Sequence, residues 1–134
     1  KHNNYLPYFM GALEAKNKKC NDAIILNNFG RVCDSTIANI FIIRNGSVFT
    51  PALSDGCIAG LMRRFILTQL KATGIIVTET TISPEEMLAA DEVFLTNSIY
   101  NIRWVAGIEN KSYDNTITTG ILTQLQQTNP DIFC

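Results

Sequence analysis

The chain has 134 residues, which is the length of one domain with a sizeable core. Apolar residues make up 46% and charged residues 17% of it, as in ordinary globular proteins and unlike disordered chains. A formal net charge of −1 gives no electrostatic reason to expect nucleic acid or an anionic membrane as a partner. No apolar run approaches the roughly 20 residues of a membrane-spanning helix, and no stretch resembles a signal peptide.

The cysteines indicate neither a metal site nor a disulfide framework. They lack C-x-x-C spacing and only one histidine, His2, accompanies them, so we expect no metal. A domain of this length does not need disulfides, which favours reduced thiols and a cytoplasmic location. The chain begins with Lys1 rather than methionine and runs at once into structured-looking sequence, which suggests a piece of a longer protein. The cysteines are Cys20, Cys33, Cys57 and Cys134.

The first part of the chain predicts a helix and then two hairpins. Residues 4–19 carry apolar side chains at the spacing of one helix face, namely Leu6, Phe9, Met10 and Leu13. Short apolar segments separated by turn residues predict antiparallel strands. The Asn45-Gly46 pair is a strong hairpin signal. We expect these strands at 23–26, 31–33, 38–44 and 47–49.

The second part predicts helices that alternate with strands. Residues 58–73 form an amphipathic pattern that ends at Gly74, and residues 83–86 form a capping box that starts a short helix. Hairpins mixed with β-α-β crossovers imply one α/β (α+β mixed) domain over residues 1–134, with a mixed sheet flanked by helices. The remaining elements are expected as strands at 75–81, 92–96 and 99–108 and a helix at 116–127.

A glycine-rich loop and a carboxylate could together hold a phosphorylated, nitrogen-containing ligand. Gly60 lets the backbone approach a ligand closely, and the helix start after it presents amide groups near Leu61 and Met62 that favour a phosphate. Asp34 could keep a ring nitrogen protonated, as a pyridine-based electron sink requires. Each feature also has a purely structural interpretation, because many helices follow a glycine and an aspartate at a strand end often caps a turn.

Two further side chains could serve such a ligand. Ser98 follows the expected strand 92–96 and could offer its hydroxyl to a phosphate, although hydroxyls at strand ends commonly satisfy backbone groups. Lys1 could form a Schiff base if it were buried beside the ligand with a lowered pKa, although a lysine at a chain start is usually solvated. The residues alone leave both interpretations open.

Four segments, in this order, resemble those of class IV aminotransferases, the fold-type IV pyridoxal-phosphate enzymes. Residues 1–6 (KHNNYL) look like the K-H-x-N or K-x-x-N segment, and residues 34–41 (DSTIANIF) look like the E-x-x-x-x-N-[LI]-F segment. Residues 50–51 (TP) with 58–63 (IAGLMR) are similar to the T-P … L-x-G-[IV]-x-R segment. Residues 91–98 (DEVFLTNS) are similar to the A-D-E-x-F segment. The match covers essentially the whole chain and corresponds to the C-terminal half of these enzymes.

The resemblance implies catalytic tasks for three residues. Lys1 would form the Schiff base with pyridoxal 5′-phosphate and then shuttle the α-proton. Asp34 would meet the pyridine nitrogen. It is one methylene shorter than the family's usual glutamate, so it would have to lie closer to the ring or act through a water molecule. Tyr5 would contact the phenolic oxygen of the cofactor.

The resemblance also implies how the cofactor would be held. Ile58 would pack on the face of the ring. The two amides after Gly60, those of Leu61 and Met62, would bind the phosphate together with the hydroxyl of Ser98. No metal takes part in this arrangement.

The implied fold is a mixed, partly barrel-like sheet flanked by helices, as in the C-terminal domain of D-amino-acid-aminotransferase-like enzymes. The absent N-terminal domain would supply an arginine to the phosphate and much of the substrate pocket. The isolated fragment is therefore expected to be inactive. Further expected partners are an amino-acid or aminochorismate substrate and a second subunit in a homodimer.

The leading functional hypothesis is a branched-chain-type aminotransferase that transfers an amino group between an amino acid and a 2-oxo acid. The alternative is an enzyme like aminodeoxychorismate lyase, in the 4-aminobenzoate and folate pathway, because K-H-x-N, G-L-M-R and L-T-N-S look slightly closer to the lyases. A third hypothesis, from another class, is a non-catalytic truncated domain.

Overall fold

Five strands form a central mixed sheet in the computed structural model, which describes residues 6–132. Their order across the sheet is β5-β4-β3-β6-β7. Neighbouring strands are antiparallel except β4 and β5, which are parallel because a crossover that contains a helix connects them. The expected mixed sheet is confirmed, and its described strands do not close into a barrel. The bounds are β3 (Asn39–Arg44), β4 (Ser47–Pro51), β5 (Val77–Thr80), β6 (Glu92–Asn97) and β7 (Asn101–Trp104).

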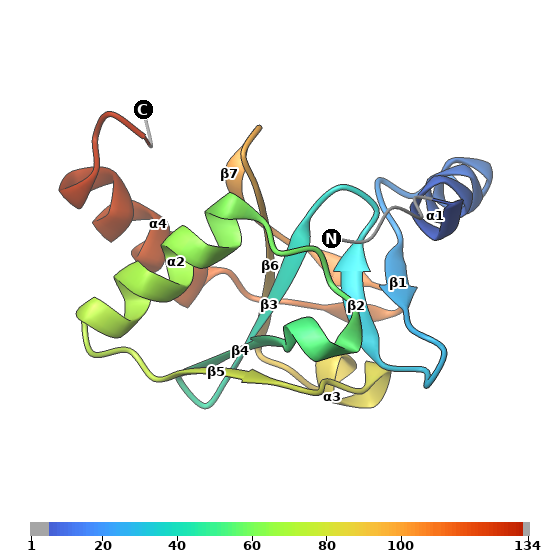
Figure 1. The fold of residues 1–134 in the computed structure, drawn as a ribbon, viewed down its shortest axis with the longest axis horizontal. Coiled ribbons are helices and arrows are strands. Elements are labelled where there is room, and N and C mark those ends of the chain that lie inside the picture. Colours follow the sequence, from blue (N-terminus) through green and yellow to red (C-terminus); the bar gives the residue numbers. More distant parts are fainter. Residues whose placement is uncertain (1–5, 133–134) are drawn as a thin grey trace.

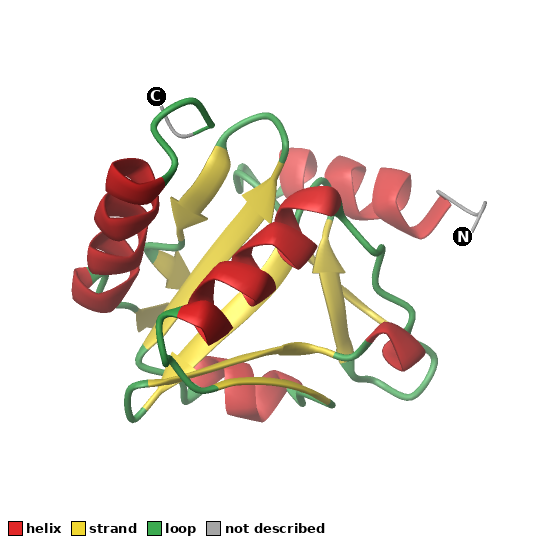
Figure 2. Ribbon diagram, turned by 60° about the vertical axis from the view of Figure 1, so that its left-hand side comes forward, coloured by secondary structure: helices red, strands yellow, loops and turns green. Residues whose placement is uncertain are grey.

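Helices lie on both faces of this sheet (Figures 1 and 2). One face carries α2 (Leu61–Ala72) and α4 (Thr116–Thr128), and the other carries the short α3 (Pro84–Leu88). The first hairpin forms a separate two-stranded sheet, with α1 beside it at one end of the molecule. The remaining bounds are α1 (Leu6–Asn17), β1 (Ile24–Leu26), β2 (Val32–Ser35), the 3₁₀ turn η1 (Leu53–Asp55), β8 (Gly107–Ile108) and β9 (Lys111–Ser112).

The core consists of two apolar clusters, one on each face of the sheet. Phe41 of β3 and Phe94 of β6 pack under α2 and α4, with their rings stacked at a centroid distance of 4.9 Å. Ile40 of β3 and Val93 of β6 point to the opposite face and pack against Met87 of α3. Because β3 and β6 are covered on both faces, their sequences are nearly continuous apolar runs rather than alternating ones.

Three details differ from the sequence expectations. The helix expected from residue 58 begins at Leu61, because Gly60 has an extended backbone (φ −67°, ψ 148°) and serves as the N-cap. The strand expected over 99–108 is divided into β7 and β8. The apolar face expected on α1 does not meet the described core, since α1 buries Tyr8 and Ala15 instead. The residues of that face are 45–62% exposed: Leu6, Phe9, Met10 and Leu13.

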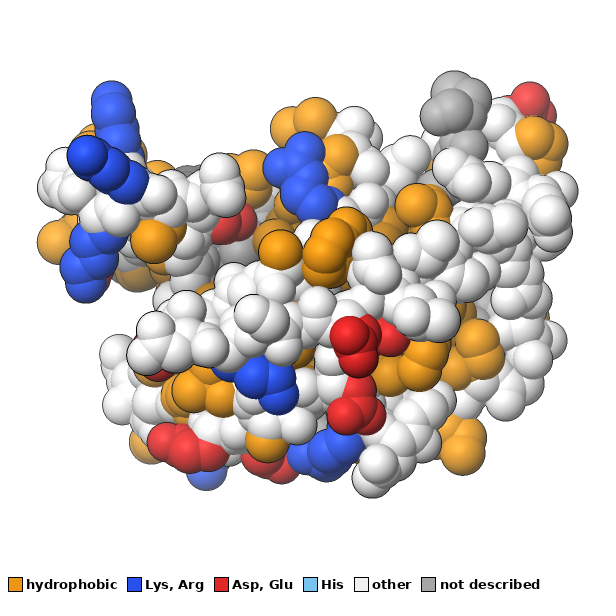
Figure 3. Space-filling view, turned by 180° about the vertical axis from the view of Figure 1, so that it is seen from behind, with side chains coloured by type: hydrophobic (Ala, Val, Ile, Leu, Met, Phe, Trp, Pro, Cys, Tyr) orange, Lys and Arg blue, Asp and Glu red, His pale blue; other side chains and the backbone are white. Residues whose placement is uncertain are grey.

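Side chains of both charge signs lie on the face seen in Figure 3. Figure 3 shows Lys and Arg side chains gathered at the end of the molecule where α1 lies, and charges of both signs scattered elsewhere on that face. Lys18 pairs there with Glu14 at 2.8 Å, one helical turn away.

Among the helices of residues 6–132, none combines the length and apolarity needed to cross a bilayer. Over the same residues, no group of three or more His, Cys, Asp and Glu side chains is placed to hold a metal ion.

The start of α4 is held by a buried carboxylate from the sheet. Glu92 of β6 is 2% exposed, and its Oε1 accepts hydrogen bonds from the backbone N–H (2.8 Å) and hydroxyl (2.7 Å) of Thr118. Its Oε2 accepts from the backbone N–H of Ile117 at 2.8 Å. Asn115, the N-cap residue, makes no side-chain capping bond. Glu92, which is remote in sequence, therefore caps the start of α4 in its place.

We expect Glu92→Gln to lower the free energy of unfolding by about 1–3 kcal/mol. Both carboxylate oxygens of Glu92 accept hydrogen bonds, and the NH₂ group of glutamine, which can only donate, would replace one of them and face another donor. Urea denaturation measures this change. Glu109→Gln is the matched control, because Glu109 is exposed, and it should change the free energy by less than about 0.5 kcal/mol. Equal stability of the Glu92 variant and the wild-type protein would contradict the capping role.

Candidate functional site

A cavity of about 240 Å³ lies between the start of α2, the β2–β3 region and the turn after β6. Its lining includes every candidate site residue that falls within the described part of the chain. These residues come from three separate segments, so the fold gathers in one place what the sequence keeps apart. They are Asp34, Ile58, Gly60, Leu61, Met62 and Ser98. Lys1 and Tyr5 lie outside the described residues.

Asp34 provides a buried negative charge in the lining of this cavity. It lies in β2 and is 1% exposed. Its Oδ2 accepts hydrogen bonds from the backbone N–H of Ile58 and from the hydroxyl of Tyr8, both at 2.9 Å. Its Oδ1 accepts from the side-chain amide of Asn39 at 2.8 Å. These donors compensate the burial of the charge and fix the orientation of the carboxylate.

Two residues that position Asp34 were not predicted as part of the site. Tyr8 reaches it from α1, and burial, followed by the charge of Asp34, raises the pKa of Tyr8, so its hydroxyl stays a neutral donor. Asn39 also donates to the carbonyl of Ile58 at 2.7 Å, which ties the carboxylate to the loop before α2. Asn39 is the asparagine of the DSTIANIF segment, so the sequence motif could have identified it as a site residue. The sequence carried none for Tyr8, because the partners are 26 positions apart.

The start of α2 also lines the cavity. No side chain caps this helix and its first turn contains no acidic residue. The amides of Leu61 and Met62 belong to that first turn, and amides in this position favour an anion such as phosphate. A Cβ at Gly60 would collide with Oδ1 of Asn39. Space, rather than backbone conformation, therefore requires glycine at this position.

Hydrogen bonds hold the start of α2 and the turn after β6 in place. Arg63, in the first turn of α2, donates through Nη2 to the carbonyl of Pro51 (3.1 Å) and to Oε1 of Glu79 (2.8 Å), and so fastens the helix to the sheet. Asn97 organises the turn after β6, because its Oδ1 accepts from the amides of residues 99 and 100 at 2.9 and 3.0 Å. Ser98 is exposed in this turn, at the wall of the cavity.

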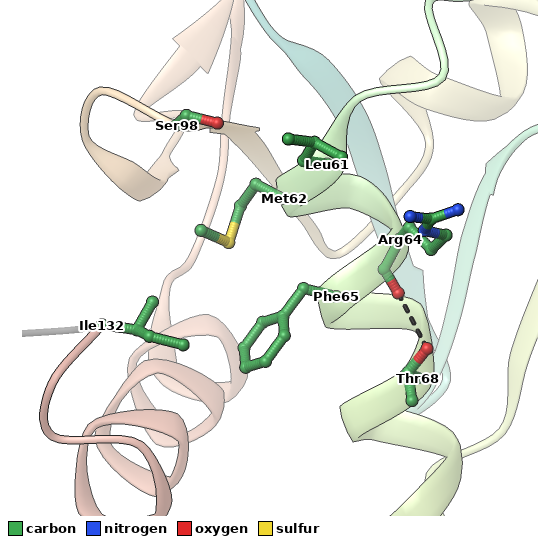
Figure 4. A pocket seen from close by; sticks show the side chains of 7 residues that line it. All are labelled: Leu61, Met62, Arg64, Phe65, Thr68, Ser98 and Ile132. Atoms are coloured by element: carbon green, nitrogen blue, oxygen red, sulfur yellow. Dashed lines mark hydrogen bonds between the residues drawn. The ribbon is translucent and has the colours of Figure 1, made fainter.

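A second hollow of about 430 Å³ adjoins the cavity and shares Leu61, Met62 and Ser98 with it. Figure 4 shows Met62 and Phe65 of α2 facing Ile132, which follows α4, across an apolar space. Ligand pockets commonly measure roughly 300–1,000 Å³, so the cavity alone is small and the hollow extends it.

Two buried thiols flank the site without adding a nucleophile. Cys33 precedes Asp34 and Cys57 precedes Ile58. Burial, followed by the charge of Asp34, raises the pKa of the Cys33 thiol to about 11 and that of the Cys57 thiol to about 12. Both thiols therefore remain protonated at neutral pH, and a protonated thiol is a poor nucleophile.

The arrangement is complementary to a ligand with three particular parts. A basic ring nitrogen would find the buried carboxylate of Asp34, and an anionic group would find the uncapped start of α2 with Ser98. A flat ring between them would lie against Ile58, which is 38% exposed at the cavity wall. The described residues thus fit a phosphorylated pyridine.

Comparison with known proteins gives one consistent family. The family model described as "Amino-transferase class IV" matches residues 1–108. The chain is 33% identical over 129 residues to aminodeoxychorismate lyase from Vibrio harveyi, covering 96% of this chain and 48% of that protein. It is 35% identical over 106 residues to a probable branched-chain-amino-acid aminotransferase from Synechocystis sp., covering 79% of this chain and 35% of that protein.

The solved structures agree with the sequence relatives. An aminotransferase from Brucella abortus, determined with its cofactor PLP, superposes with a TM-score of 0.85 at 26% identity, covering 90% of this chain and 44% of that chain. The chain spans about half the length, or less, of these relatives. The resemblance drawn from the four sequence segments is confirmed, and the chain belongs to the class IV aminotransferase family.

Proposed function

We propose that this chain is the cofactor-binding part of an enzyme that uses pyridoxal 5′-phosphate for amino-group chemistry. The observation that supports the proposal most strongly is the convergence of Asp34, Ile58 and the uncapped start of α2 on one cavity. When bound, this cofactor supplies an electron sink for the electron pair left on the substrate's α-carbon.

Asp34 would hold a proton on the ring nitrogen of the cofactor, since a buried carboxylate favours a positive charge beside it. Tyr8 and Asn39 would position that carboxylate through their hydrogen bonds. Ile58 would pack on the ring and keep water from that face.

The amides of Leu61 and Met62, which follow Gly60, would bind the phosphate together with the hydroxyl of Ser98. Lys1 would hold the cofactor covalently and move a proton to and from the substrate's α-carbon. Tyr5 would contact the phenolic oxygen.

The leading reaction is transfer of an amino group between an amino acid and a 2-oxo acid, supported by relatives named as branched-chain aminotransferases. An aminodeoxychorismate lyase activity is the second candidate, favoured by the Vibrio harveyi relative, which matches over 96% of this chain. In either case residues 1–134 would form the C-terminal domain of a longer cytoplasmic enzyme. Its N-terminal part would complete the substrate pocket, and two subunits would form a homodimer.

Reductive trapping tests the cofactor assignment. We expect borohydride treatment of the full-length protein, loaded with pyridoxal phosphate, to leave a pyridoxyl group on Lys1, detected by peptide mass mapping. Lys1→Ala should abolish the modification, whereas Lys16→Ala, which removes an exposed lysine of α1, should leave it unchanged. An unmodified wild-type protein would instead support the non-catalytic domain.

Product analysis separates the two reactions. An aminotransferase should exchange amino groups between an amino acid and a 2-oxo acid without releasing pyruvate from aminodeoxychorismate. Release of pyruvate from that substrate would favour the lyase and exclude a pure aminotransferase.

A further inference from the structure

Thr96 carries a buried hydroxyl that has no hydrogen-bond partner within the described part of the chain. It lies in β6 and is 0% exposed. Its Oγ1 is one of three buried side-chain polar atoms without a partner among residues 6–132. The other two, Nε of Arg63 and the hydroxyl of Tyr100, belong to residues that do not line the cavity. An unpaired buried hydroxyl is unfavourable, so this one requires an explanation.

The position of Thr96 relates the hydroxyl to the proposed cofactor site. Thr96 lines the cavity together with Asp34 and Ser98. The sheet register places Thr96 directly opposite Asn39 of β3, and opposed residues of antiparallel strands share one face of the sheet. Thr96 therefore neighbours the amide that holds Asp34, and it precedes Ser98 by two residues.

We propose that Thr96 is a further cofactor-binding residue, whose hydroxyl donates a hydrogen bond to an oxygen of the bound pyridoxal phosphate. The inference rests on the proposed function, because it needs a ligand in the cavity. Pyridoxal phosphate presents acceptor oxygens on its phosphate and its ring, and a hydroxyl is a donor that can rotate to reach one of them. Valine would fill the same space without a buried hydroxyl, so the threonine is explained when a ligand supplies the missing partner.

Three variants test the inference in the full-length protein. Thr96→Val should raise the dissociation constant of pyridoxal phosphate about tenfold, as expected for the loss of one hydrogen bond to a polar ligand. Thr96→Ser keeps the hydroxyl and should bind within about threefold of the wild-type protein. Without cofactor, Thr96→Val should unfold at the same urea concentration as the wild-type protein or a higher one, because the substitution removes no existing bond.

Thr118→Val is the matched control. Thr118 is also a buried threonine, but its hydroxyl already donates to Glu92. This variant should lose stability without cofactor and keep its affinity for pyridoxal phosphate. A Thr96→Val protein that binds the cofactor as the wild-type protein does, or that loses stability as Thr118→Val does, would overturn the inference alone. A wild-type protein that binds no pyridoxal phosphate would overturn the proposed function as well.

Discussion

Asp34→Asn is expected to lower the rate of the amino-group reaction by roughly 10²- to 10⁴-fold, the range associated with a positioned proton-holding group. Both oxygens of Asp34 accept hydrogen bonds, so the NH₂ group of an asparagine would have to replace one of them. In either position this NH₂ group would face another hydrogen-bond donor. Asn39 cannot relieve the conflict by turning, because its Nδ2 also donates to the carbonyl of Ile58. Steady-state kinetics at saturating pyridoxal phosphate measures the loss.

Two variants distinguish a lost proton contact from a general loss of stability. Asp34→Glu restores the carboxylate that is usual in the family and should keep more activity than Asp34→Asn. Asp55→Asn alters another buried aspartate, which accepts from the hydroxyl of Thr81 and does not line the cavity. It should lower the unfolding free energy while leaving the rate of the folded enzyme within about threefold. Similar rates for Asp34→Asn and the wild-type enzyme would contradict the role of Asp34.

Gly60→Ala is expected to have the second largest effect. The new methyl group would meet Oδ1 of Asn39, whose amide is already bound to Asp34 and to the carbonyl of Ile58. Asn39 would have to move, and the start of α2 would move with it. We expect the unfolding free energy to fall by about 1–3 kcal/mol. We also expect pyridoxal phosphate to bind at least about tenfold more weakly, a factor that corresponds to about 1.4 kcal/mol.

Gly120→Ala is the control for this substitution. Gly120 lies inside α4, where a Cβ would meet no atom within 4 Å. Alanine should therefore raise the unfolding free energy by about 0.5–1 kcal/mol and leave cofactor affinity unchanged. Urea denaturation and cofactor titration of both variants measure these effects. If Gly60→Ala behaved like Gly120→Ala, the close approach at Gly60 would not matter for the site.

Local sequence signals predicted most of the fold because they act within a few residues. The Asn45-Gly46 turn joins β3 and β4 as expected. Both bonds of the predicted capping box are present, since Ser83 accepts from the amide of Glu86 and Glu86 accepts from the amide of Ser83. The support of α4 by Glu92 was not predictable in this way, because the carboxylate and the amides that it binds are 25 and 26 positions apart.

The candidate site shows the same division. Motif order placed Asp34, Ile58 and Ser98 in one family pattern, and the structure places all three at one cavity. The family pattern assigned no role to Tyr8 or Thr96. Tyr8 joins the site through a hydrogen bond to a carboxylate that is 26 positions away in the sequence. Thr96 stands out because its hydroxyl lacks a partner among residues 6–132. Neither property is visible in a pattern of residue types.

The most direct test of the central claim is nitrogen NMR of the full-length protein loaded with pyridoxal phosphate that carries ¹⁵N in its ring. If Asp34 holds a proton on that nitrogen, the wild-type protein should give the resonance of a protonated pyridine at neutral pH. Asp34→Asn should give that of an unprotonated one. An unprotonated resonance in the wild-type protein, or the same resonance in both proteins, would contradict the assignment of Asp34 to the ring nitrogen.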